Sequence, residues 1–482
     1  MRDCATEKEM EIDMSVKKLQ IAVCLILLGF LSLQPALALA QQTQKEQPPA
    51  GATPKPSTLP QKQTFTLKNG LRVTLVPYGS VPKVTVRAVV RAGSLNETAE
   101  QVWLASLTGT MLKEGTTTRT AEQIAQEAAQ MGGSINVGVG ADQTNVSGDV
   151  LSEFGPQLVA LIADVMQRPL LPATELPRLK NDRLRQLTIA RTQPGQLATE
   201  RFRQVVYPNH PYGRVFPTEQ MIQGYTIENI QKFYKDNFGA ARTTLYVAGR
   251  FDAAAMKKAI TQAFEGWTRG SQPLIDIPKP VSARTLHLID RPGAAQSTIF
   301  VGLPVVDPSS PDYISLQVMD ALLGGSFASR ITSNIREAKG YTYSPNSQVS
   351  TRYRDAYWVE VADVTTAVTG PSLKEIFYEI DRLRREPPTE DELQGIKNYL
   401  AGIFVLQNSN RQGVINQLAF LDLHGLDEKY LTTYVQKVFA ITPKDVQRVA
   451  QTYLIDDKMT LVVVGDRGKI ADQLGPFGKV EN

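Results

Sequence analysis

The chain has 482 residues, which is too long for one ordinary domain and predicts two or three. Hydrophobic residues make up 42% of the sequence and charged residues 21%, as in soluble globular proteins. The net charge of +4 is too small to indicate a nucleic-acid partner.

The first 40 residues are predicted to be a secretory signal peptide. Residues 14–18 form a basic start, residues 19–33 are apolar, and Ala38-Leu39-Ala40 supplies the small residues that a signal peptidase reads. Met14 is then the expected start of translation. The apolar run is short for a membrane span, so a retained anchor is the less favoured alternative. We expect a periplasmic protein that has no membrane contact after signal cleavage.

Both cysteines, Cys4 and Cys24, lie in this leader, so the mature chain is expected to have neither a disulfide nor a thiolate metal site. Residues 41–63 are rich in Gln, Pro, Lys and Thr, a composition that predicts a disordered tether.

An N-terminal domain is predicted over residues 64–265. Alternating residues around Asn69-Gly70 predict a hairpin within residues 64–76. A polar loop is expected from about residue 192 to Tyr212. The other expected strands are 84–90, 134–139, 143–150 and 243–248, and the expected helices are about 97–112, 121–131, 154–166, 174–191, 226–237 and 253–264.

A linker at residues 266–284 is predicted to lead into a C-terminal domain at residues 285–482, with strands at 285–289 and 297–302 and a helix at 313–323. The two halves look alike. The segment 226–233 resembles 442–449 at an offset of 216, and 244–249 matches 460–465 at the same offset. Each pair is a threonine-capped helix followed by an apolar strand that ends in glycine, so a duplication is predicted. Grouped helices and hairpins favour α+β halves, each an antiparallel-rich sheet with helices on one face.

One stretch carries the strongest candidate for chemistry. Gly324-Gly325 precedes a predicted helix with apolar residues at Phe327, Ile331 and Ile335, which Gly340 ends. A strand is expected to start at Tyr341 and Tyr343. Arg336 and Tyr343 would then meet at one corner, where a guanidinium and a phenol can both donate to a carbonyl oxygen.

These motifs resemble the insulinase/pitrilysin family of zinc peptidases, the inverzincins, and in particular the short bacterial members and the processing-peptidase subunits. The resemblance runs from about Phe65 to Val480 and implies two duplicated α/β-roll halves that close like a clam shell. It rests on the duplication, the 324–344 stretch, and the segments Leu67-Lys68-Asn69-Gly70-Leu71, Arg91-Ala92-Gly93-Ser94 and Gly132-Gly133-Ser134-Ile135-Asn136.

Active members of that family carry H-x-x-E-H on the first long helix and a glutamate ligand about 76 residues later. Here Ser106 and Thr110 fall at the histidine positions, Gly109 at the glutamate and Gln186 near the third ligand. Neutral hydroxyls are poor zinc ligands, and glycine offers no base. The only histidines, His210, His287 and His424, are far apart in the sequence. No zinc is therefore expected in this chain.

The resemblance implies that Arg336 and Tyr343 bind the substrate backbone and steady the oxyanion. It also implies that the strand bearing Gly133, Ser134 and Asn136 can pair with an extended peptide; a purely structural role for that strand is equally open.

The leading hypothesis is a non-metal subunit of a heterodimeric zinc peptidase, whose homologous partner supplies zinc and an intact H-x-x-E-H. The alternative is a catalytically inactive binding or assembly protein, and a self-sufficient zinc enzyme is least favoured.

Overall fold

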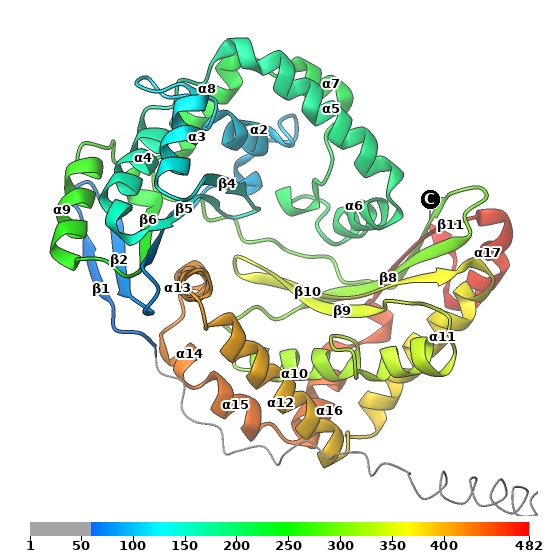
Figure 1. The fold of residues 1–482 in the computed structure, drawn as a ribbon. Helices are drawn as coiled ribbons and strands as arrows, with labels where there is room; N and C mark the ends of the chain where they lie inside the picture. The colour runs from blue at the N-terminus through cyan, green and yellow to red at the C-terminus, as the bar shows by residue number, and fades with distance from the viewer. Residues whose placement is uncertain (1–58, 482) are drawn as a thin grey trace, which may run out of the picture. The chain divides into compact units, whose positions relative to one another are not determined.

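The computed structural model describes residues 59–481 (Figure 1). The expected signal peptide at residues 1–40 and most of the expected tether at 41–63 lie outside the described residues. Within this range, no helix combines the length and the apolar composition needed to cross a membrane.

Two mixed six-stranded sheets form the framework. The first has the strand order β1-β2-β6-β3-β5-β4 and the second β12-β7-β11-β8-β10-β9. The strands of the first sheet are β1 Gln63–Thr66, β2 Arg72–Pro77, β3 Lys83–Val90, β4 Ile135–Val139, β5 Thr144–Leu151 and β6 Thr243–Gly249. Those of the second are β7 Thr285–Asp290, β8 Gln296–Val305, β9 Asn346–Arg352, β10 Asp355–Thr365, β11 Thr460–Gly465 and β12 Val480–Glu481.

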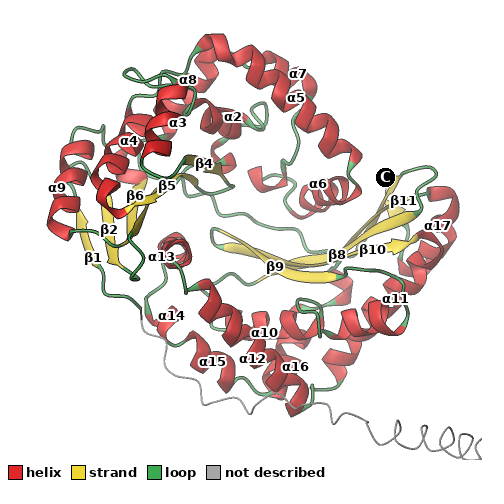
Figure 2. Ribbon diagram, viewed as in Figure 1, coloured by secondary structure: helices red, strands yellow, loops and turns green. Residues whose placement is uncertain are grey.

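Helices pack on both sheets (Figure 2). Those between the strands of the first half are α2 Leu104–Met111, α3 Ala121–Gln130, α4 Gly155–Gln167, α5 Leu176–Thr192, α6 Pro194–Val206, α7 Glu219–Gly224, α8 Ile227–Asn237 and α9 Ala253–Phe264. Those of the second half are α10 Tyr313–Leu323, α11 Thr369–Arg385, α12 Glu390–Gln407, α13 Arg411–His424, α14 Lys429–Thr432, α15 Tyr434–Ala440, α16 Pro443–Tyr453 and α17 Arg467–Leu474.

The two sheets share one topology, which confirms the predicted duplication and the α+β class. In each, an equivalent parallel pair lies next to antiparallel strands: β2 with β6, and β7 with β11. Thr226 and Thr442 both form capping boxes at the equivalent helices α8 and α16. Only the outermost strands β1 and β12 differ, since β1 pairs antiparallel and β12 parallel.

Both faces of each sheet are apolar. Successive strand side chains point to opposite faces, and on β6 Leu245 and Val247 face one core while Tyr246 and Ala248 face another. The equivalent strand β11 repeats this arrangement. Each sheet therefore needs helices on both faces, and its own half supplies most of them on one face only.

The second faces are covered by an exchange of helices between the halves (Figure 1). Helix α6 of the first half packs on β8 and β11, and α13 of the second half packs on β3 and β6. Phe202 of α6 lies among Phe300 and Tyr357, and Leu418 of α13 lies beside Tyr246. The expectation of helices on one face was therefore incomplete.

Two sequence-based expectations in the first half were wrong. Residues 194–206 were expected as part of a polar loop but form α6, with Pro194 in its first turn. The helix expected at 97–112 begins only at Leu104, because Trp103 takes a left-handed φ of 73°. The Glu97 carboxylate accepts hydrogen bonds from the backbone N–H groups of Trp103 and Ala105, at 3.2 and 2.8 Å, and so caps the shortened helix.

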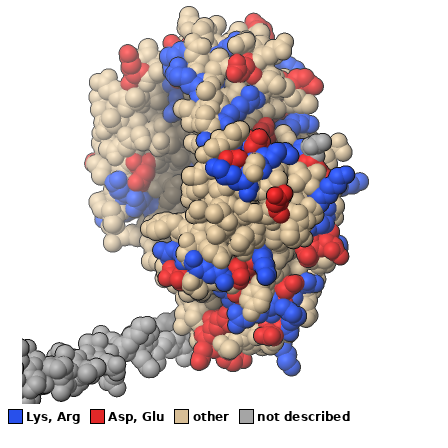
Figure 3. Space-filling model, turned by 90° about the vertical axis from the view of Figure 1, so that its right-hand side faces the viewer, with Lys and Arg blue, Asp and Glu red and all other residues tan. Residues whose placement is uncertain are grey.

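Lysine and arginine side chains alternate with aspartate and glutamate over the face shown in Figure 3. No large field of one sign covers this face, as the small net charge leads one to expect.

We expect Phe202→Ala to destabilise the protein by about 3–5 kcal/mol, because it removes a fully packed ring from the exchanged helix. Phe202 is 1% exposed, and its ring centroid lies 5.2 Å from that of Tyr357. Denaturant unfolding of the purified chain measures the change. Val405→Ala, at a side chain that is 61% exposed, is the control and should change little; equal stability of Phe202→Ala and wild type would contradict the role given to α6.

Candidate functional site

The four positions aligned with a zinc site lie on α2 and α5, and three of them converge on one arginine. Arg183 of α5 donates through Nη1 to Gln186 Oε1 at 2.6 Å. Its Nη2 donates to the Ser106 backbone oxygen at 2.9 Å and to Thr110 Oγ1 at 2.6 Å. A guanidinium thus holds together the residues that stand where the family has its ligands.

Arg183 is the residue that sequence reasoning missed. It lies three positions before Gln186 on the same helix, so both side chains project from one face of α5. Burial lowers the pKa of Arg183, while neighbouring Asp182 opposes the shift. A guanidinium keeps its proton in proteins, so a fixed positive charge occupies this position.

Gly109, at the position of the family's base, is closed off by β4. A Cβ built on Gly109 would collide with Val139 Cγ2 and lie 3.5 Å from Val137 Cγ1. A side chain at position 109 cannot enter unless the Val139 side chain moves. The glycine at this position therefore suits the packing of β4 against α2 in this chain.

Zinc does not fit these residues. The donors are hydroxyl, amide and backbone groups already engaged by a cation, and a dication beside Arg183 would be repelled. Among residues 59–481, no group of three or more His, Cys, Asp or Glu side chains could hold a metal ion. His210, His287 and His424 are each buried in separate surroundings.

The predicted corner is built differently from the expectation. Residues 332–338 form a π-helix instead of an α-helix, and Gly340 ends it with φ of 65°. Tyr341 N donates to the Ile335 carbonyl at 2.8 Å across this turn. No strand starts at Tyr341, since β9 begins at Asn346. Such wide turns recur at functional sites, where they redirect side chains.

Acidic side chains of α11 and α12 anchor the corner. Arg330 makes a bidentate ion pair with Glu392 of α12, at 2.6 and 2.9 Å, which places it in a structural role. Asn334 donates to Glu375 and Glu379 of α11 at 3.0 and 2.8 Å. The backbone that carries Arg336 is therefore fixed on two helices.

Arg336 and Tyr343 come together as predicted. The Arg336 guanidinium carbon lies 5.2 Å from the centroid of the Tyr343 ring and 4.4 Å from that of Phe327. Tyr343 is 81% exposed and Phe327 70% exposed. Arg336 also pairs with Glu337 at 2.9 Å. Two large aromatic side chains are therefore exposed to solvent, and the Arg336 guanidinium lies against both rings.

Gly324 and Gly325 lie against two buried carboxylates. A Cβ on Gly324 would meet Glu360 Oε2 at 2.5 Å, and one on Gly325 would meet Asp320 Oδ2 at 2.7 Å. Asp320 accepts hydrogen bonds from Ser347 Oγ at 2.6 Å and Trp358 Nε1 at 2.8 Å. Burial raises its pKa to about 6 against these two bonds.

Glu360 is fully buried, and neither of its oxygens has a hydrogen-bond partner of good geometry within the described range. Burial first, and the charge of Asp320 second, raise the pKa of Glu360 well above its usual range.

The strand proposed to bind substrate is the edge strand β4. It pairs with β5 alone among the described strands, which leaves its other edge open for backbone pairing. Gly133 and Ser134 precede it, and Asn136 Nδ2 donates to Ser134 Oγ at 3.2 Å. Gly133 is pressed against strand β5, where a Cβ would lie 2.9 Å from Val150 Cγ1.

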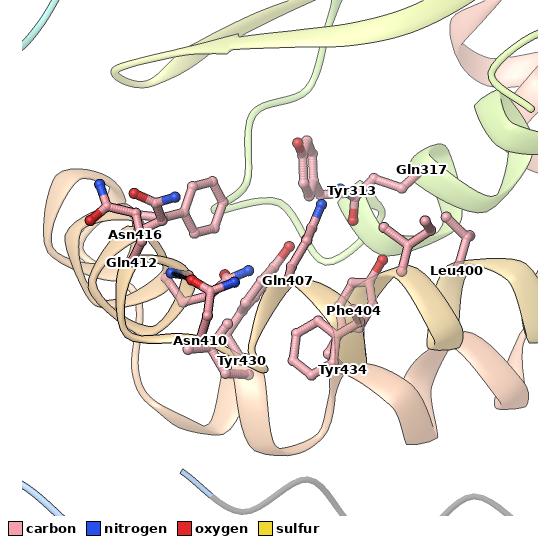
Figure 4. Close-up of a pocket in the computed structure, with 15 residues that line it drawn as sticks. Tyr313, Gln317, Leu400, Phe404, Gln407, Asn410, Gln412, Asn416, Tyr430 and Tyr434 are labelled. Atoms are coloured by element: carbon pink, nitrogen blue, oxygen red, sulfur yellow. Dashed lines mark hydrogen bonds between the residues drawn. The ribbon is translucent and has the colours of Figure 1, made fainter. Parts of the chain in front are cut away.

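A separate cavity of about 650 Å³ lies in the second half and has a different chemistry (Figure 4). Its lining comes from α10, α12, α13, α15 and the segment around α14, and none of its fifteen residues carries a charge. Carboxamides and aromatic rings dominate it, including Gln317, Gln407, Asn416 and Tyr434. No carboxylate, histidine or cation is among the lining residues, and burial raises the pKa of its three tyrosines, Tyr313, Tyr430 and Tyr434, which makes them poor acid–base groups.

Known proteins share both the sequence and the fold. A model of the insulinase family, peptidase family M16, matches residues 72–216, and a model described as the peptidase M16 inactive domain matches residues 224–400. A Rickettsia felis protein named as an uncharacterized zinc protease is 26% identical over 341 residues, 69% of this chain and 81% of that protein.

A probable mitochondrial-processing peptidase subunit beta from Arabidopsis thaliana is 23% identical over 430 residues, 84% of this chain and 78% of that protein. The crystal structure of a peptidase M16 inactive domain from Pseudomonas fluorescens has the same fold, with a TM-score of 0.77 at 24% identity. That match covers 84% of this chain and 98% of the other.

The strand orders, the duplication and the two matched family models agree. The chain belongs to the insulinase (M16) peptidase family and has both its N-terminal and its inactive C-terminal domain.

We expect Gly109→Ala to destabilise the chain by about 1–3 kcal/mol, because the new methyl group collides with Val139. The control is Gly395 in α12, where a built Cβ has no neighbouring atom within 4 Å. Gly395→Ala should therefore be neutral or stabilising, because alanine favours the helix more than glycine does. Thermal unfolding measures both. Adding Val139→Ala should recover much of the loss; no recovery would contradict the proposed closure by β4.

Glu360→Gln, which removes the buried acid, should make the free energy of unfolding depend less on pH. Because the folded pKa values of Glu360 and Asp320 are raised, the native state binds protons more tightly than the unfolded chain. The stabilisation that these two protonated acids give to the native state is complete below about pH 4. It is lost as the pH rises through about 6 and beyond.

Calorimetric unfolding temperatures should therefore fall more steeply with rising pH in the wild type than in Glu360→Gln. Glu386→Gln, at an exposed position on the same half, should follow the wild type. Parallel curves for wild type and Glu360→Gln would refute the assignment.

Proposed function

We propose that this chain is the non-metal subunit of a heterodimeric zinc peptidase of the periplasm. It binds an extended peptide and brings Arg336 and Tyr343 to the active site of a homologous subunit with an intact H-x-x-E-H. That partner holds the zinc and the general base. Nucleic acid has no part in this function.

The observation that carries the proposal is the guanidinium of Arg183 on Ser106, Thr110 and Gln186. A positive charge fixed by three hydrogen bonds at the former ligand positions supports the view that the zinc chemistry belongs to another chain. A peptidase of this family that lacks its own metal needs a partner to hydrolyse a peptide bond.

The exposed corner supports a role in trans. Tyr343 and Phe327 project to solvent, and the hydrogen bonds and ion pairs of the segment from Arg330 to Thr342 are made within its own half. A partner surface that covers these rings would bury apolar area and bring substrate to Arg336.

The two side chains suit a carbonyl that becomes an oxyanion. Arg336 offers a charged planar donor, and the Tyr343 hydroxyl offers a second donor from the other side of the turn. Contact with the aromatic rings keeps the guanidinium in place, so little ordering is needed when substrate binds. The ion pair with exposed Glu337 must release one Nη of Arg336 at that step.

The edge strand β4 supports peptide binding through the backbone. An extended segment that adds to its open edge gains main-chain hydrogen bonds without a required side-chain sequence. Gly133, Ser134 and Asn136 lie where such a segment would enter. One relative is named as a subunit of a processing peptidase, which fits a subunit role for this chain.

The second candidate function is a catalytically inactive binding or assembly protein. The closed metal positions favour it equally, because they remove activity from the chain alone. The two functions differ in whether Arg336 and Tyr343 matter for cleavage by a complex.

In a reconstituted complex with the H-x-x-E-H homologue, we expect Arg336→Ala or Tyr343→Phe to lower kcat/KM about 10²–10³-fold, as loss of one oxyanion donor typically does. Quenched fluorescent peptides measure the cleavage. Tyr378→Phe, at a half-exposed tyrosine of α11, is the matched control and should retain activity. Unchanged kcat/KM in both corner variants, in a complex that forms normally, would leave the binding or assembly role.

A further inference from the structure

A second cavity, of about 490 Å³, lies beside α2 and connects the two sheets. Ser106 of the former metal helix lines it, as do Val139 at the end of edge strand β4 and Thr351 near the end of edge strand β9. The cavity therefore lies at the Val139 end of β4, beside the end of any peptide paired with that strand.

Three arginines line this cavity, and each comes from a different element. Arg203 is on α6, Arg214 follows the loop after α6, and Arg352 ends β9. Two acids, Glu97 and Asp142, line the same cavity, so its cations outnumber its possible anions. Like charges gathered in one cavity repel one another, and an anionic ligand would relieve that repulsion.

The hydrogen bonds of these arginines go to neutral groups. Arg214 Nη1 donates to the Glu97 backbone oxygen at 2.9 Å, and Arg203 Nη2 donates to Tyr357 Oη at 3.4 Å. Arg352 Nη1 donates to the Thr351 backbone oxygen at 2.7 Å. Arg203 Nε is buried and has no acceptor among the described residues. Several charged N–H groups thus remain for a ligand.

The two acids of the cavity already have hydrogen-bond partners and offset its positive charge only in part. Asp142 accepts the Tyr212 hydroxyl at 2.5 Å and the Tyr353 backbone N–H at 3.2 Å. Glu97 caps α2, and burial raises its pKa to about 8 against its two backbone hydrogen bonds. Burial raises the pKa of Tyr357, but the charges of Arg203 and Arg352, together with hydrogen bonds from Ser350 and Arg203, lower it overall.

We propose that this arginine cavity binds a carboxylate of the peptide substrate, in the first place the C-terminal carboxylate of a segment paired with β4. A planar carboxylate matches the paired N–H groups of guanidinium. The cavity is open to solvent and lies beside the end of a pairing edge, so the end of a bound peptide can place its carboxylate there. This inference rests on the proposed peptide-binding function and assigns it a substrate class.

The test uses the purified chain without a partner subunit, so it does not depend on cleavage. Three N-terminally labelled peptides of one neutral sequence are compared by fluorescence anisotropy: a free C-terminal acid, its C-terminal amide, and the amide with one internal glutamate. We expect the free acid to bind at least about tenfold more tightly than the plain amide, the usual scale of charge-assisted hydrogen bonds.

Arg203→Gln/Arg352→Gln should abolish that preference. Arg185→Gln/Lys232→Gln removes two charges from side chains that are 68% and 74% exposed and should retain it. If the first pair does not fold, Arg352→Gln alone should reduce the preference. A gain only for the glutamate peptide, lost in the cavity variant, would assign the carboxylate to a side chain.

Equal binding of all three peptides, or a preference that survives in the cavity variant, would overturn the inference. If the peptides show no carboxylate preference, the corner variants still test the proposed function, because their effect is measured as cleavage by the complex. Inactive corner variants with intact carboxylate preference would conversely separate the two sites.

Discussion

The exchange of α6 and α13 is the constraint on which the rest of the structure depends. Each sheet has two apolar faces, and a sheet with a bare apolar face is not stable in water. Since each half covers mainly one face of its own sheet, neither half is complete without a helix from the other. Polar bonds fix the same contacts, as between Arg87 and Asn416 at 2.6 Å and between Arg411 and Asp149 at 3.1 Å. The duplicated halves are thus one cooperative unit.

Two regions of that unit differ in how their side chains are held. On α2 and α5 the positions aligned with metal ligands are tied to a permanent cation, and Gly109 packs against the Val139 side chain. At the corner, by contrast, an ion pair to α12 and hydrogen bonds to α11 fix a π-helix that carries the half-buried Arg336. Phe327 and Tyr343 are exposed beside this arginine, and large exposed apolar side chains of this kind support the proposed contact with a partner.

The sequence predicted the elements with strong local signals and missed those that depend on tertiary contacts. The Asn69-Gly70 hairpin, the threonine-capped helices and the Gly340 stop are local, and all are present. Residues 194–206 were expected to be a polar loop because their apolar side chains face a sheet of the other half, whose strands follow about 100 to 260 residues later in the sequence. Arg183 was not predicted, because the lack of zinc ligands in the sequence does not show which neighbouring side chain bonds to the residues at those positions. The π-helix depends on Asn334 and Arg330 bonding to α11 and α12, which no local pattern encodes.

The exchanged helix also explains why the arginine cavity exists. Helix α6 crosses onto the second sheet to cover it, and this brings Arg203 close to Tyr357 of β10 and into one cavity with Arg352 of β9. The apolar side of α6 is used for stability, so its polar side is free to carry a charge into the space between the two edge strands. A helix required by the fold therefore supplies a group for binding. The proposed binding of a peptide by backbone and carboxylate depends on this placement of cations beside the open edge of β4, and no metal takes part in it.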